Sequence, residues 1–178
     1  MGIKLVAIDL DDTLLDPDLQ ISSHCLEIIR QVQKKGILVT LATGRMFSSA
    51  LPYARLLQAD VSLITYQGAL VKNSLSGEIL YNKPVPFAEA VEVMDFFHQA
   101  GVHYHCYFGD RLCMERLTKD GQDYSELAGV EPVLMENLRE TAKTRETLKI
   151  LSVVHDKKLV IKLQGGLTAR YSPQHLNI

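Results

Sequence analysis

The first 66 residues alternate between short apolar runs and helical segments, and this alternation constrains the fold more than composition does. Residues 3–10 (IKLVAIDL) are nearly continuously apolar, as in a strand of a parallel sheet that is buried on both faces. Residues 37–42 (ILVTLA) are expected to form a second buried strand, and residues 61–66 (VSLITY) a third strand. One helix is predicted between the capping serines 22–23 and Gly36, and a second helix ends near Gln58. This β-α-β-α-β order predicts an α/β fold with a right-handed, doubly wound parallel sheet.

A change of pattern follows near residues 83–86, where two prolines in three residues indicate a domain boundary. Residues 1–83 are therefore expected to form one domain and residues 84–178 a second. The first is expected to end in a small hairpin of residues 69–73 and 78–82.

The second domain is expected to be an α+β module of mainly antiparallel character. Its predicted elements are a helix over 87–100, strands over 102–108 and 111–116 around a Gly109-Asp110 turn, a helix near 119–128, a strand near 147–154, a short helix near 156–164 and a strand near 167–171.

The motif Asp9-Leu-Asp11-Asp-Thr13 directly follows the first apolar run. Ligands of open α/β sheets bind at the carboxyl ends of the strands, where this motif lies. One carboxylate can attack phosphorus, and the other can protonate the leaving oxygen and then activate water. Both can help to hold Mg2+, which prefers oxygen ligands. The alternative interpretation is a pair of exposed acids in a polar loop without a catalytic role, but the position after a buried strand favours a catalytic role.

A second polar turn, Thr43-Gly44-Arg45, follows the second apolar run and is expected at the same edge of the sheet. A hydroxyl and turn amides in this place can bind a phosphate oxygen. Thr43 could instead serve as the N-cap of the following helix.

Composition excludes several classes of function. The net charge of −2 and pI near 6.3 give no basic surface for nucleic acid, and no Lys/Arg-rich run or long apolar segment indicates a membrane. The N-terminal residues lead straight into a strand, so no secretory signal is expected. Three cysteines without metal-ligand spacing favour a reduced, cytoplasmic protein.

Three segments, DLDDTLLD, LATGR and ITYQGAL, together resemble the haloacid dehalogenase (HAD) superfamily, in its Cof-type branch with a large cap. The resemblance implies a Rossmann-like core and an α/β cap at about 84–178. It implies that Asp9 is the nucleophile, that Asp11 is the general acid/base, and that Thr43, with Gly44 and Arg45, binds phosphate. Asp9 and the Asp11 carbonyl would bind Mg2+. The chain has Asp12 where many relatives have Gly, and Gln67 where many have Asn.

The family pattern continues with a lysine and a Gly-Asp-x-x-Asn-Asp segment, neither of which is found in this sequence. The expected core is therefore incomplete in its C-terminal half, as in a truncated or naturally short form. Residues 3–10 would then form an exposed apolar edge that invites self-association or poor solubility. Losing a cation and metal ligands removes electrostatic stabilisation, and one such donor can be worth about 3 kcal/mol, so turnover is expected to be weak or undetectable.

The resemblance implies a phosphatase that acts on a small phosphorylated metabolite, such as a sugar phosphate, through an aspartyl-phosphate intermediate. A phosphomutase and a non-catalytic phosphate-binding fragment or module are the alternatives.

Histidines and cysteines in the second domain are less informative. His103 and His105 alternate along one strand, but two ligands without a third make a weak metal site. Cys106 is expected directly opposite Cys113 in the hairpin, as a reduced packing pair rather than a disulfide. Cys25 is expected to face the core of the first domain.

Overall fold

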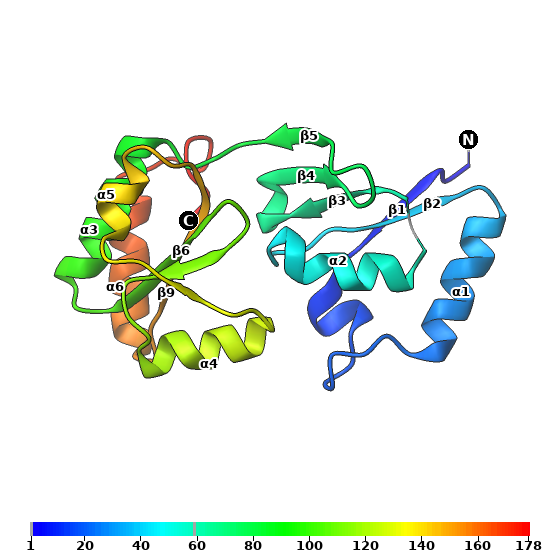
Figure 1. The fold of residues 1–178 in the computed structure, drawn as a ribbon, viewed down its shortest axis with the longest axis horizontal. Coiled ribbons are helices and arrows are strands. Elements are labelled where there is room, and N and C mark those ends of the chain that lie inside the picture. Colours follow the sequence, from blue (N-terminus) through cyan, green and yellow to red (C-terminus); the bar gives the residue numbers. More distant parts are fainter. Residues whose placement is uncertain (1, 59) are drawn as a thin grey trace. The chain divides into compact units, whose positions relative to one another are not determined.

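The computed structural model of the chain describes residues 2–58 and 60–178. The chain divides into two compact units, Met1–Lys83 and Pro84–Ile178, which are considered separately (Figure 1). Among the described residues, no helix combines the length and the apolar character that crossing a bilayer requires.

The first unit is built on strands that follow one another across a sheet. β1 (Leu5–Ile8) pairs in parallel with β2 (Leu38–Leu41), and one parallel bridge joins the end of β2 to β3 (Ser62–Thr65). β4 (Leu70–Asn73) pairs antiparallel with β3 and with β5 (Ile79–Asn82), which confirms the predicted hairpin. The parallel α/β arrangement expected from the sequence is therefore confirmed (Figure 1).

Two helices connect the parallel strands, α1 (Ser23–Lys34) and α2 (Phe47–Leu56), as predicted. Ser22 caps α1 by accepting a hydrogen bond from the Cys25 amide at 3.2 Å, and Gly36 adopts the positive φ of 76° that often follows a helix. The unit's buried side chains come from both helices and from β2 and β3; among them are Ile29, Val39, Leu41, Ala50, Ala54 and Leu63.

The strand β1 is shorter and more exposed than the sequence predicted. Residues 3–10 were expected to be buried on both faces, but β1 covers only 5–8, and within it Leu5 and Ala7 are exposed while Val6 and Ile8 are half-buried. The reason is that β1 has only β2 as a neighbour in the described part of the chain. The other expectation, an exposed apolar edge, describes β1 correctly.

The second unit contains a four-stranded sheet in the order β8-β7-β6-β9, in which β6 is antiparallel to both neighbours and β8 is parallel to β7. Its elements are α3 (Phe87–Gln99), β6 (His103–Phe108), β7 (Leu112–Met114), α4 (Lys119–Ala128), β8 (Val133–Leu134), α5 (Leu138–Ala142), β9 (Thr147–Val153) and α6 (Lys157–Thr168). The mainly antiparallel α+β arrangement is as expected.

The hairpin of β6 and β7 turns at Gly109 and Asp110, as predicted. Both residues have positive φ (57° and 60°), which is typical of the tight turns that join two antiparallel strands. Cys106 lies opposite Cys113 as expected; both are buried, and both are free thiols.

The end of the chain differs from expectation. α6 continues to Thr168, so the helix predicted to end near residue 164 is longer and the strand predicted near 167–171 is wrong. Leu163 and Leu167, one helical turn apart, are both buried. The short elements β8 and α5 were not predicted.

Candidate active site

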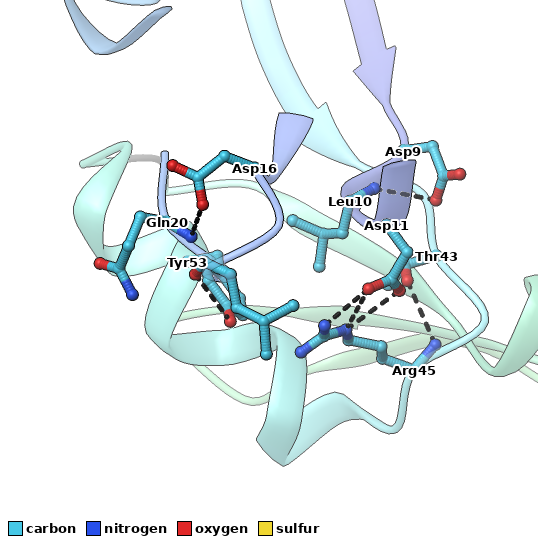
Figure 2. Close-up of polar contacts among 9 residues, drawn as sticks. Asp9, Leu10, Asp11, Asp16, Gln20, Thr43, Arg45 and Tyr53 are labelled. Atoms are coloured by element: carbon cyan, nitrogen blue, oxygen red, sulfur yellow. Dashed lines mark hydrogen bonds and ion pairs between the residues drawn. The ribbon is translucent and has the colours of Figure 1, made fainter. Parts of the chain in front are cut away.

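The loop after β1 begins at Asp9, whose carboxylate folds back onto its own loop. Oδ1 of Asp9 accepts a hydrogen bond from the Leu10 amide at 2.8 Å (Figure 2). Residues 10–14 form a short irregular helical segment, closed by a 2.9 Å hydrogen bond from the Leu15 amide to the Leu10 carbonyl. Leu10 and Leu14 are buried, so they hold the loop against the unit while Asp9 and Asp11 stay exposed.

Asp12 has a left-handed backbone, with φ 56° and ψ 12°. Glycine adopts this conformation without strain, and aspartate tolerates it better than most residues do. The geometry gives a physical reason why Asp or Gly suits this position.

The loop after β2 carries Thr43 in a buried position. Its Oγ1 accepts a hydrogen bond from the Arg45 amide at 3.2 Å, and its own amide donates to the Ile64 carbonyl at 2.9 Å. The alternative that Thr43 is the N-cap of the next helix is wrong, because α2 begins after Met46. Thr43 therefore organises the turn.

A third loop, after β3, donates two backbone hydrogen bonds to the Thr43–Arg45 turn. The Tyr66 amide donates to the Arg45 carbonyl at 2.9 Å, and the Gln67 amide donates to the Thr43 carbonyl at 3.1 Å. A Cβ on Gly44 would lie 3.3 Å from Cγ of Gln67, so a larger residue there would require the Gln67 side chain to shift. Sequence reasoning noted Gln67 only as a departure from the family pattern and missed this supporting role.

The first two loops are joined by an ion pair between Asp11 and Arg45 (Figure 2). Nη2 of Arg45 lies 2.6 Å from Oδ1 of Asp11, and Nε lies 3.1 and 3.0 Å from Oδ1 and Oδ2. The Arg45 side chain is 13% exposed and the Asp11 side chain 49%. The hydrogen bond from Arg45 lowers the pKa of Asp11, and burial partly opposes this effect. The same bond raises the pKa of Arg45.

The residues expected at the site thus fall into two groups. Arg45 bonds Asp11 through its guanidinium and Thr43 through its backbone amide, and Gly44 lies between Thr43 and Arg45 in the chain. Asp9 comes from the same edge of the sheet, but its carboxylate faces the Leu10 amide and lies apart from the Asp11–Arg45 pair (Figure 2).

The described residues contain no cluster of three or more His, Cys, Asp or Glu side chains that could hold a metal ion. The donors of the loop nevertheless suit Mg2+ in kind, since an exposed carboxylate at Asp9 and a backbone carbonyl at Asp11 are hard oxygen ligands. Mg2+ commonly uses one or two carboxylates and completes its coordination with waters and substrate phosphates.

Comparison with known proteins decides the family. A family profile described as haloacid dehalogenase-like hydrolase matches residues 6–176. The chain belongs to this family. As a haloacid dehalogenase-like hydrolase it is similar to a putative phosphatase of Streptococcus pyogenes serotype M6, with 30% identity over 108 residues that cover 59% of this chain and 40% of the relative. It is 24% identical over 118 residues to the pyridoxal phosphate phosphatase YbhA of Escherichia coli, covering 66% and 43%.

Solved structures agree with this fold. TM0651 from Thermotoga maritima superimposes with a TM-score of 0.79 and 25% identity, covering 95% of this chain and 62% of TM0651. A haloacid dehalogenase-like hydrolase from Bacteroides thetaiotaomicron gives a TM-score of 0.82 at 24% identity, covering 95% and 64%. The chain thus spans less than two thirds of these structures and about two fifths of the two curated relatives.

Proposed function

We propose that this hydrolase is a Mg2+-dependent phosphatase that acts on a small phosphorylated metabolite, such as a sugar phosphate. The observation that carries the proposal is that Asp11 and Thr43, at the carboxyl ends of adjacent parallel strands, are linked through Arg45. The phosphatase names of the relatives support it, among them a pyridoxal phosphate phosphatase and an HMP-PP phosphatase. We also propose a reduced cytoplasmic setting, which the three free thiols support.

In the proposed reaction, a carboxylate oxygen of Asp9 attacks phosphorus, an oxygen–phosphorus bond forms, and the bond to the leaving oxygen breaks. Asp11, in its protonated form, gives a proton to the leaving oxygen. It then takes a proton from the water that attacks the aspartyl phosphate, whose bond to Asp9 breaks and releases inorganic phosphate and the free carboxylate. The Leu10 amide engages one oxygen of Asp9, which leaves the second for attack. Thr43 and the Gly44 turn would bind phosphate oxygens. Bound Mg2+, held by Asp9 and the Asp11 carbonyl, would reduce repulsion between carboxylate and phosphate.

We further propose that turnover by these 178 residues is weak, because the sequence contains neither the lysine nor the Gly-Asp-x-x-Asn-Asp segment of the family pattern. A phosphate-binding module without turnover is the second candidate. The lack of that acidic segment in the sequence favours it, because the segment would supply further metal ligands. A phosphomutase would share the first half of the reaction and differ in the acceptor.

The test is release of phosphate from p-nitrophenyl phosphate and from a panel of sugar phosphates, followed by 31P NMR with and without Mg2+. We expect slow, Mg2+-dependent release that Asp9→Asn abolishes. Asp18→Asn, which changes an exposed acid later in the same loop, is the matched control and should leave the rate unchanged. Phosphate binding without release would favour the module, and transfer to a second sugar would favour the mutase. Neither binding nor release would reject the proposal.

A further inference from the structure

Arg45 is held at its backbone amide, at its backbone carbonyl and at its guanidinium. Its amide donates to Thr43 Oγ1, and its carbonyl accepts from the Tyr66 amide. Its guanidinium bonds Asp11, and its Cζ lies 5.4 Å from the centroid of the Tyr53 ring, within the range of a cation–π contact. With only 13% of its side chain exposed, Arg45 is a fixed part of the site rather than a mobile surface cation.

The contact with Asp11 uses two N–H directions of the guanidinium fork, those at Nε and Nη2, and both oxygens of the carboxylate. This geometry fixes where a carboxylate points, which a lysine ammonium does not do. Asp11 is half exposed and precedes the left-handed Asp12, and among the described residues Arg45 is the side chain to which it bonds. Arg45 therefore determines the orientation of Asp11.

A phosphate at the same fork would have to displace Asp11. The displaced carboxylate would then lie beside the incoming anion without its counter-charge, and like charges at short range repel. The geometry thus sets Arg45 apart from Thr43 and Gly44, although all three belong to one turn.

We propose that Arg45 is a positioning residue for Asp11 and not a phosphate ligand. The inference rests on the proposed function, because it assigns a role within that site. It changes the expectation from the sequence, in which Thr43, Gly44 and Arg45 all bind phosphate.

The experiment uses the full chain, labelled with 15N, and follows the Nε–H resonance of Arg45, which is assigned by its loss in Arg45→Lys. Asp11→Asn should shift this resonance, whereas inorganic phosphate added with Mg2+ should leave it in place. Phosphate affinity, measured by calorimetry, should be equal in the wild type and in Arg45→Gln. Arg139→Gln is the matched control, because it breaks the Arg139–Asp95 ion pair of the other unit at 3.0 Å.

The two roles give opposite results. If Arg45 bound phosphate, Arg45→Gln would weaken phosphate binding by about tenfold or more, as expected for a lost charge-assisted hydrogen bond, and phosphate would shift the Nε–H resonance. That result would overturn the proposal, as would a resonance that Asp11→Asn leaves unchanged. In a turnover assay, Arg45→Gln should lower kcat without raising KM, and Arg45→Lys should restore part of kcat. A wild type that neither binds nor releases phosphate would reject the proposed function, while the Asp11→Asn shift would still test the pairing.

Discussion

The loops that carry the candidate site contain three non-glycine residues with a left-handed backbone. Asp12, Tyr66 and Gln67 all have φ between 52° and 56°. A side chain in this region costs about 1–2 kcal/mol, with Asp and Asn penalised less than most. The loops accept this strain because their backbone hydrogen bonds fix the turn beneath Thr43 and Arg45.

Asp12 offers a direct measure of that strain. Asp12→Gly should leave the free energy of unfolding unchanged or raise it by up to about 1 kcal/mol, because glycine adopts the left-handed conformation freely. Asp12→Val should lower it by about 1–3 kcal/mol. Urea denaturation followed by circular dichroism measures both. Asp123→Gly, within helix α4, is the control and should be destabilising; a loss of stability in Asp12→Gly would contradict the argument.

His105 is a buried imidazole in the second unit. Its Nδ1 lies 3.2 Å from Nε2 of His103, its ring lies 4.2 Å from that of Tyr124, and its Nε2 has no hydrogen-bond partner among the described residues. Burial, and to a smaller extent the positive charge of its neighbours, lowers the pKa of His105 to about 3. Burial also lowers the pKa of His103.

Acid should therefore destabilise the second unit through His105. The unfolded chain binds a proton below about pH 6.5, whereas the folded chain resists it down to about pH 3. Stability is thus retained above pH 6.5 and falls as the pH drops towards 3, by at most about 1.4 kcal/mol per pH unit from this group. The free energy of unfolding, measured by urea denaturation at several pH values between 3 and 6.5, should fall less steeply with decreasing pH in His105→Phe than in the wild type. An unchanged slope would contradict the assignment, and His98→Phe, on an exposed site of α3, is the control.

For helices and strands, the sequence predicts those features that residues close together in the chain determine, such as helix ends and tight turns. Capping residues such as Ser22 and turn residues such as Gly109 fixed the ends of α1 and of the β6–β7 hairpin. The meeting of the Asp11 and Thr43 loops followed from parallel strand order. The pairing of Asp11 with Arg45 did not, because it depends on side-chain directions that no local pattern encodes.

The predictions were wrong where contacts between residues far apart in the sequence determine the secondary structure. The pair Gly165-Gly166 resembles a helix end, yet α6 continues through it, with Leu163 and Leu167 buried and Gly166 lying against Phe96. A Cβ at Gly166 would lie 2.9 Å from Cζ of that ring. The two-residue strand β8 exists through its pairing with β7, and two residues carry no periodic signal.

These two glycines form a matched pair for a test of helix α6. Gly165→Ala meets no atom within 4 Å and should raise the free energy of unfolding by up to about 1 kcal/mol, because alanine favours helix. Gly166→Ala must displace the Phe96 ring and should be less stable than Gly165→Ala. Thermal and urea denaturation measure the difference. Equal stabilisation by both changes would show that Phe96 does not confine this position.

At the scale of the whole molecule, the first unit leaves apolar side chains uncovered around β1. Ile3, Leu5 and Leu38 are 72%, 54% and 58% exposed. Leu5 and Leu38 are direct partners in the parallel register, so they lie on the same face of the sheet. An apolar strand with one free edge is a template for pairing with another chain.

We therefore predict that the purified chain self-associates through β1. Light scattering during size-exclusion chromatography should show a mass that rises with concentration, and Leu5→Lys should reduce it. Leu127→Lys changes a leucine of helix α4, in the other unit, that is even more exposed (69%), and should have no effect. A monomer at all concentrations, with no binding of a hydrophobic dye, would contradict the prediction.

The distribution of thiols gives the protein its own chemical reporters. Cys25 is half-buried on α1 in the first unit, whereas Cys106 and Cys113 are buried opposite one another in the second. Burial raises the pKa of both buried thiols, so the reactive thiolate is scarce as well as covered. Alkylation of Cys25 should proceed from the folded chain, while alkylation of the opposed pair should wait for the β6–β7 hairpin to open. Labelling rates read by mass spectrometry would then time the opening of the second unit, with Cys25 as an internal reference for an accessible thiol.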